Sequence, residues 1–336
     1  MSRGELESDQ ETTEKSVRES LNEALFEEME RDSRVLLYGE DVAEYGGLYR
    51  ITQGLYDEFG EERVFDSPLS ETAIAGSAVG AALVGARPVV EIMYADFLPI
   101  VGDHLINYAA KMHFNYGDDT GVPMVVRSMY GVGDGHGLHH GQSPEGWFLN
   151  VPGLKIVMPS TPRDYKGLLK AAIRDEDPVL FLENKTSYDS TGPVPAGEYT
   201  VPLCESDVKR DGTDATVVAI GGMVTEALEA ADRLSDRDVE VEVVDPRTVA
   251  PLDVGPILES VRKTNVLVVA HEAPVFGGFG SEVAAQVIDD AFFYLDAPVK
   301  RVGAPSTPIP FAENLEESYL PTADDIEAAV VEAIET

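Results

Sequence analysis

Short apolar runs alternate along the chain with segments in which apolar residues recur at three- and four-residue spacing. The first periodic segment, residues 17–30, predicts a helix with one apolar face. Runs that predict buried strands lie at 34–39, 88–93, 122–128, 154–159 and 179–182, and further helical spacing lies at 100–112 and 162–174. Strands that alternate with helices in this way indicate parallel strands joined by helical crossovers.

A second series of the same kind follows a break in the period. Residues 184–212 lose the apolar spacing and gather prolines and glycines, which indicates a connection between domains. Beyond it, strands are predicted at 215–220, 239–244, 266–270 and 299–302, and helices at 224–234, 254–261, 280–291 and 323–334. The fold class is therefore α/β, with two doubly wound, mostly parallel sheets. We expect a disordered arm at 1–14, domains at 15–190 and 213–336, and a linker at 191–212.

Charge and cysteine content narrow the class of protein. Asp and Glu number 61 against 25 Lys and Arg, a net charge of −36. Such a field repels nucleic acid and anionic membranes, so neither is expected as a partner. Because the acid is spread along the whole chain, we interpret it as a folded surface suited to concentrated salt. The single cysteine, Cys204, and the lack of a signal peptide or a membrane-spanning run predict a soluble cytoplasmic protein.

One predicted helix carries the carboxylate that is best placed for chemistry. Ser70 is expected to cap this helix, and Glu71 falls in its first turn. Gly76 and Gly80 lie four residues apart, and each costs roughly 0.5–1 kcal/mol relative to alanine, so we expect tight packing against a neighbour in compensation. Glu71 is then expected at a buried end, in an apolar surround that includes Leu69. Acids are favoured in any first helical turn, so position alone leaves a structural role open.

Two other stretches hold candidate chemistry. Glu40 directly follows the first strand, at the end where sites form in parallel sheets, although a plain loop acid fits equally well. Residues 131–148 form a glycine-rich loop with three histidines, His136, His139 and His140. Their spacing fits no common zinc pattern. A histidine on a mobile loop suits proton transfer near neutral pH, so we favour that role.

Two further stretches are weaker candidates. GGFGSEV at 277–283 opens a predicted helix but lacks the spacing and the following acid of a dinucleotide-binding loop. AAIRDEDP at 171–178 ends a helix with free carbonyl groups, which suit a cation but also occur at every helix terminus.

Taken together, these stretches resemble one family over nearly the whole chain from about Val17. The resemblance is carried by LLYGEDVA, RVFDSPLSETAIAGSAVGAALVGARPVVEIMYADF, GHGLHHGQSPEGWFLNVPGLKIVMPSTP, DPVLFLE and HEAPVFGGFGSEV. The family comprises beta subunits of the thiamine-diphosphate-dependent decarboxylating component of 2-oxoacid dehydrogenase complexes, including pyruvate, branched-chain 2-oxoacid and acetoin dehydrogenases. It implies a transketolase-like pyrimidine-binding domain followed by a transketolase C-terminal-like domain.

The resemblance implies a role for each matching residue. Glu71 matches the glutamate that hydrogen-bonds the aminopyrimidine of thiamine diphosphate and so promotes ylid formation. His140 matches a loop histidine that gives a proton when the lipoyl group of the acyltransferase component is acylated, and His139 is the second choice. Residues that match the lining of the cofactor site are Glu40, Leu69, Met93 and Phe97. The carbonyls of a monovalent-cation site, with potassium as the expected ion, match Ala172, Asp175 and Asp177.

The resemblance also implies an alpha subunit. In this family Mg²⁺ holds the cofactor's diphosphate on a GDG motif followed by an asparagine. Residues 133–135 here spell GDG, but they lie inside the histidine loop and no Asn–Asn pair follows at the required distance. Mg²⁺ is therefore expected on the alpha subunit, in a heterotetramer of two alpha and two beta chains. The substrate, whether pyruvate, a branched-chain 2-oxo acid or acetoin, stays open.

Two other functions fit the sequence less well. A non-catalytic docking subunit would not need both Glu71 and His140. A nucleotide-dependent dehydrogenase needs a glycine fingerprint after the first strand, where this chain has GEDVAEYGG.

Overall fold

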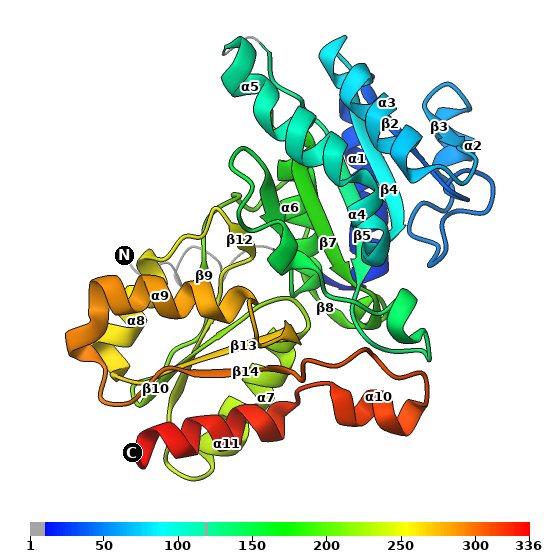
Figure 1. Cartoon of the computed structure of the whole chain (residues 1–336). Helices are drawn as coiled ribbons and strands as arrows, with labels where there is room; N and C mark the ends of the chain where they lie inside the picture. The colour runs from blue at the N-terminus through cyan, green and yellow to red at the C-terminus, as the bar shows by residue number, and fades with distance from the viewer. Residues whose placement is uncertain (1–10, 118–119) are drawn as a thin grey trace.

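Two α/β lobes lie one above the other in Figure 1, the first coloured blue to green and the second yellow to red. The computed structural model describes residues 11–117 and 120–336. Within them lie a seven-stranded sheet, a five-stranded sheet and a two-stranded ribbon. Both larger sheets are mostly parallel, which confirms the predicted class.

The seven-stranded sheet forms the centre of the first lobe. Its strand order is β12-β6-β7-β5-β4-β2-β3, and all pairs are parallel except β12 with β6. Its strands from this lobe are β2 (Val35–Gly39), β3 (Val64–Asp66), β4 (Arg87–Tyr94), β5 (Val125–Tyr130), β6 (Lys155–Val157) and β7 (Val179–Asn184). Helices α1 (Val17–Arg31) and α6 (Pro162–Arg174) cover one face, and α3 (Glu71–Leu83), α4 (Leu98–Asp103) and α5 (Ala110–Tyr116) cover the other. The short helix α2 (Leu55–Phe59) contacts β3.

Local sequence signals explain the bounds of α1 and α6. Ser16 and Glu19 form a capping box at the start of α1, and each side chain accepts a backbone hydrogen bond from the other residue. Thr161 caps α6 in a similar way, and Pro162 occupies its first turn, where a missing N–H costs nothing. The predicted helices at 17–30 and 162–174 are therefore confirmed.

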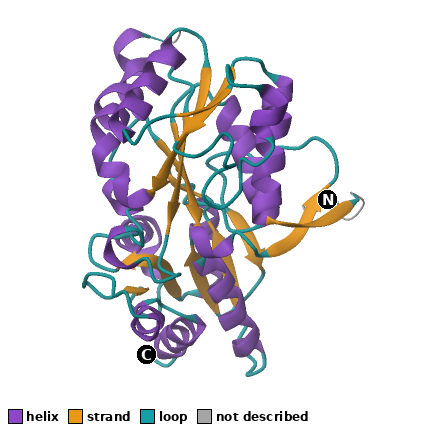
Figure 2. Ribbon diagram, turned by 90° about the vertical axis from the view of Figure 1, so that its right-hand side faces the viewer, coloured by secondary structure: helices purple, strands orange, loops and turns teal. Residues whose placement is uncertain are grey.

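Two predicted segments differ from the structure. Residues 12–14, predicted as part of a disordered arm, belong to β1 (Thr12–Ser16), which pairs antiparallel with β8 (Thr191–Pro195) in a ribbon that leaves the body near the N label of Figure 2. Residues 1–10 of that arm lie outside the described residues. The helix predicted at 100–112 is longer and contains a π-helical stretch, His104–Ala109, between α4 and α5. The polar ribbon has no apolar period, so the pattern gave no signal there.

The five-stranded sheet forms the second lobe. Its order is β14-β13-β10-β11-β9, with β9 antiparallel to β11. The strands are β9 (Asp207–Arg210), β10 (Ala215–Ala219), β11 (Val241–Asp245), β13 (Leu267–Pro274) and β14 (Lys300–Ala304). Helices α7 (Met223–Ser235) and α11 (Ala323–Ile334) cover one face, α8 (Gly255–Thr264) and α9 (Phe279–Ala291) lie on the other, and α10 (Glu313–Tyr319) reaches toward the first lobe. No helix among residues 11–117 and 120–336 is both long and apolar enough to cross a membrane.

One apolar core runs through both lobes. Tyr130 and Met158 of the first lobe belong to the same buried cluster as Val218, Val249 and Phe279 of the second. In addition, β12 (Thr248–Ala250) leaves the second lobe and joins the edge of the first sheet. The two lobes are therefore packed as one body, and the second can position residues of the first.

A buried charge cluster joins three central strands of the first sheet. The guanidinium of Arg127 on β5 donates to Glu91 on β4 at 2.9 Å and to Glu183 on β7 at 2.7 and 2.9 Å. The three side chains are 1 to 4 % exposed. The hydroxyl of Tyr188 donates a further hydrogen bond to Glu183. Burial raises the pKa of Glu91, which shows the cost of holding its charge inside the sheet.

We predict that Arg127→Met destabilises the chain by about 3–5 kcal/mol, because it leaves two buried carboxylates without their partner. Urea denaturation followed by circular dichroism measures this. Arg34→Met is the control, since Arg34 pairs with Asp32 at the surface. If the urea midpoint of Arg127→Met fell no further below the native midpoint than that of Arg34→Met, the stabilising role of Arg127 would be contradicted.

Candidate functional site

The parallel sheet brings several predicted site residues to one edge. Strands β5, β4, β2 and β3 are neighbours in that order, so their carboxyl ends meet on the same side. Glu40 follows β2 and Glu71 opens the helix after β3, whereas Phe97 follows β4 and His140 lies in the loop after β5. We call this group of strand ends the carboxyl edge. Sites of doubly wound folds form at such edges.

Glu40 is buried at the carboxyl edge with an unused acceptor. It is 8 % exposed, and its Oε1 has no hydrogen-bond partner among the described residues. Burial, and next the charge of nearby Glu71, raises the pKa of Glu40. Gly39 makes this position possible, because a Cβ there would lie 2.7 Å from the carbonyl oxygen of Glu91. A buried carboxylate oxygen without a donor is suited to accept a hydrogen bond from a ligand.

Glu71 lies in the first turn of α3, as predicted, but its surroundings differ from the prediction. It is half-buried, and Leu69 beside it is 84 % exposed. Ile74, further along the same turn of α3, is buried. Ser70 occupies the N-cap position without a side-chain capping bond. The predicted apolar pocket around Glu71 is therefore incomplete within this chain, because α3 begins at an open edge of the sheet.

The two glycines of α3 also differ from each other. A Cβ at Gly76 would come within 3.0 Å of the His104 ring, which confirms tight packing at that position. A Cβ at Gly80 would meet nothing within 4 Å. The prediction of close packing is wrong for Gly80, since none of the described residues lies against that side of α3.

His140 packs edge-on against aromatic rings. Its ring centroid lies 4.6 Å from that of Tyr94 and 5.6 Å from that of Phe97. Met93 instead packs with the core on the α1 and α6 side of the sheet, so the structure does not bring it against Phe97. The sequence did not point to Tyr94, although it is the last residue of β4 and directly follows Met93, which was a predicted site residue.

Contacts from several elements hold the histidine loop, residues 131–148. Asp96, just after β4, accepts a hydrogen bond from the side-chain amide of Gln142 at 2.8 Å. Glu316 on α10 accepts from the backbone N–H of Gly135 at 3.0 Å, so residues 133–135 form part of this held turn. Lys185, directly after β7, donates to the carbonyl of His140 at 2.8 Å. These contacts join segments that lie far apart in the sequence, so no local sequence pattern predicts them.

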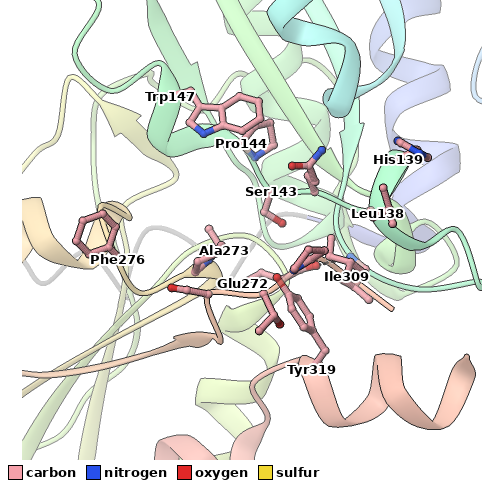
Figure 3. A pocket seen from close by; sticks show the side chains of 17 residues that line it. Leu138, His139, Ser143, Pro144, Trp147, Glu272, Ala273, Phe276, Ile309 and Tyr319 are labelled. Atoms are coloured by element: carbon pink, nitrogen blue, oxygen red, sulfur yellow. Dashed lines mark hydrogen bonds between the residues drawn. The ribbon is translucent and has the colours of Figure 1, made fainter. Parts of the chain in front are cut away.

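His139 lies on a different surface from His140. It lines a cavity of about 590 Å³ between the histidine loop and the second lobe, together with Trp147, Phe276 and Glu272 (Figure 3). Burial raises the pKa of Glu272 to about 7, while hydrogen bonds from the amide of Val132 and the side chain of Asn184 oppose the shift. The two neighbouring histidines therefore have different surroundings. His139 lines this cavity, whereas His140 packs against Tyr94 and Phe97.

The predicted cation site already has cationic side chains around it. The Asp175 carbonyl accepts from Arg87 at 2.9 Å, and the Ala172 carbonyl accepts from the Asp175 amide. Lys155 bridges the carboxylates of Asp175 and Asp177 at 2.9 and 3.0 Å. No group of three or more His, Cys, Asp or Glu side chains among the described residues is arranged to hold a metal. Potassium on the three carbonyls stays a prediction.

Comparison with known proteins agrees with this architecture. Residues 13–191 match the model of the transketolase pyrimidine-binding domain, and residues 205–326 match that of the transketolase C-terminal domain. The chain is 48 % identical to the 2-oxoisovalerate dehydrogenase subunit beta of Bacillus subtilis, over 94 % of this chain and 98 % of that protein. It is 43 % identical to the pyruvate dehydrogenase E1 component subunit beta of Rickettsia felis, over 94 % of this chain and 97 % of that protein.

Two further comparisons extend this result. The beta subunit of an acetoin:2,6-dichlorophenolindophenol oxidoreductase of Bacillus subtilis is 45 % identical over 95 % of this chain and 97 % of that protein. Among solved structures, a split-gene transketolase described as an inactive beta4 tetramer matches with a TM-score of 0.76 at 24 % identity, over 95 % of this chain and 98 % of that chain. The structural match shows the fold alone. The sequence matches show that the chain belongs to the family of E1-type beta subunits of pyruvate, branched-chain 2-oxoacid and acetoin dehydrogenases.

Proposed function

We propose that this chain is the beta subunit of a 2-oxoacid dehydrogenase complex. With an alpha subunit it oxidatively decarboxylates a 2-oxo acid through thiamine diphosphate, and it then acylates the lipoyl group of an acyltransferase component. The observation that carries the proposal is the placement of Glu40, Glu71 and His140 at the same carboxyl edge. Relatives named for pyruvate and for 2-oxoisovalerate both exceed 40 % identity, so either substrate class is consistent with this site.

The carboxyl edge fits the pyrimidine end of the cofactor. When bound, thiamine diphosphate supplies the electron sink for decarboxylation. The Glu71 carboxylate is placed to hold a proton on the pyrimidine ring, and its half-buried setting leaves it open to a ligand. The unpartnered Oε1 of Glu40 is placed to accept a second hydrogen bond. Phe97 supplies apolar contact beside His140.

His140 has the features of a proton donor for the lipoyl step. Tyr94 and Phe97 fix the orientation of its ring, and Lys185 holds its backbone carbonyl. An imidazole held in this way can give a proton to a sulfur leaving group without rearrangement. His139 has no such support, because it faces the cavity between the lobes.

The remainder of the active site belongs to a partner in this proposal. Leu69 is exposed and Glu71 is only half-buried, so a second chain is needed to close the pocket. A chain with a net charge of −36 is a poor host for a diphosphate without a metal ion. We assign Mg²⁺ to the alpha subunit and expect two alpha and two beta chains. The interpretation that the protein works in concentrated salt stays a prediction.

The acetoin dehydrogenase beta subunit is the second candidate function. It is favoured by the 45 % identity to the Bacillus subtilis protein of that type. The same residues would then act on a different carbonyl substrate. A purely docking subunit is disfavoured, because it would have no use for the unpartnered buried oxygen of Glu40.

We predict that Glu71→Gln lowers decarboxylation on the order of 100- to 10,000-fold, because the amide cannot share the proton that the carboxylate holds. The measurement is carbon dioxide release from a panel of 2-oxo acids by the complex assembled with its alpha subunit. Glu282→Gln is the matched control, since Glu282 also lies in the first turn of a helix, α9. Near-native turnover by Glu71→Gln would end the assignment.

We predict that His140→Ala separates the two half-reactions. Decarboxylation with an artificial electron acceptor should be largely retained, whereas acylation of a lipoyl domain should be lost, because only the second step uses the imidazole proton. Both assays are run in parallel on His139→Ala, which should retain both activities. Equal losses in the two assays for His140→Ala, or a selective loss for His139→Ala, would overturn the division of labour.

A further inference from the structure

Lys185 is a buried lysine, and among residues 11–117 and 120–336 its two hydrogen bonds both go to the histidine loop. It is 3 % exposed and lies directly after β7. Its Nζ lies 3.0 Å from Nδ1 of His136 and 2.8 Å from the carbonyl oxygen of His140. Burial lowers the pKa of Lys185, and the charges of nearby acids, led by Glu272, oppose that shift. The two acceptors and these acids favour a charged ammonium group at this buried position.

The contact with His136 fixes where the imidazole proton lies. An ammonium group can only donate, so Nδ1 of His136 is the acceptor. The proton of the neutral ring must then be on Nε2. Burial, and next the positive charge of Lys185, lowers the pKa of His136, while Asp134 and Glu316 oppose the shift. His136 is therefore neutral and in one tautomer near neutral pH.

The second lobe holds the same turn from the other side. The buried carboxylate of Glu316 accepts from the N–H of Gly135 at 3.0 Å and of Gly137 at 3.4 Å, on either side of His136. Phe311 fills the space where a Cβ at Gly137 would lie. Lys185 itself is surrounded by acids from four elements, which are Glu272, Asp134, Asp96 and Glu316.

We propose that Lys185 is a positioning residue that holds His136 as the Nε2-protonated tautomer and, through the His140 carbonyl, keeps the His140 ring against Tyr94. This deepens the proposed function, on which it rests for the role of His140. Four glycines of the loop, Gly131, Gly133, Gly135 and Gly137, have positive φ and leave the backbone free to adopt other conformations. A fixed attachment point is therefore needed if the imidazole is to meet its substrate in one orientation.

The tautomer is tested without any activity assay. In the full-length chain with ¹⁵N-labelled histidine, the His136 signals, identified by their loss in His136→Gln, should show a protonated Nε2 and an unprotonated Nδ1. In Lys185→Met the same ring should show both tautomers, and its pKa should rise because the neighbouring charge is gone. A protonated Nδ1 in the native chain, or an unchanged titration in Lys185→Met, would overturn the proposal.

The consequence for catalysis is tested with a matched lysine. Lys185→Met should slow lipoyl acylation about 100-fold, the size expected when a catalytic group is displaced by about 1 Å, with decarboxylation much less affected. Lys185→Arg, which keeps the charge and the donors, should restore part of the rate. Lys170→Met is the control, because Lys170 is equally buried but pairs with Glu27 and Glu198 away from the loop. It should leave both the tautomer and the ratio of the two activities unchanged.

The two proposals fail in different ways. If His140→Ala retains lipoyl acylation, the proposed function is wrong, although the His136 tautomer still reports on Lys185. If His140→Ala behaves as predicted and Lys185→Met matches Lys170→Met in every assay, only the role of Lys185 is wrong.

Discussion

The buried ion cluster of Arg127, Glu91 and Glu183 is the constraint on which the site depends most. It joins β4, β5 and β7. Of these strands, β4 ends at Tyr94, which packs against His140, and β7 is followed by Lys185, which donates to the His140 carbonyl. The register that the cluster holds between β4 and β5 runs to Ile92 and shifts before Tyr94. A slip of the strands at the cluster would move this irregularity, and with it the position from which Tyr94 emerges. The cluster therefore holds the central strands in alignment, and the ends of these strands form the carboxyl edge.

The second lobe helps to position the histidine loop, which follows β5. Its sheet shares a core with the first lobe, and α10 brings Glu316 against the turn that contains His136. Lys185 reaches the same turn from the end of β7. The histidine loop, which is rich in glycine, is thus held by charged side chains from both lobes as well as by the packing of Val132 and Phe148. This arrangement gives the second lobe a direct part in placing the proposed proton donor.

Much of the fold and part of the site could be predicted from the sequence. Apolar spacing located α1 and α6 because their buried faces follow the helical period, and Glu40, Glu71 and His140 could be assigned to one edge because parallel strands share a polarity. The β1–β8 ribbon carries no such period, since it is short and half of its residues are exposed. Lys185 and Glu316 were missed because their contacts join segments 45 and 181 residues apart, which no local pattern reports.

Glu71 is only half-buried and Leu69 is exposed. We therefore propose that this chain holds half of a shared cofactor site. In the proposed function the carboxyl edge would give hydrogen bonds and apolar contact to a pyrimidine, and the diphosphate would be held by the alpha subunit. Titration calorimetry of thiamine diphosphate with Mg²⁺ tests this most directly, first with the purified chain and then with the alpha subunit added. We predict that thiamine diphosphate shows no measurable binding to the chain alone and binds once the alpha subunit is present. Micromolar binding to the chain alone would contradict it.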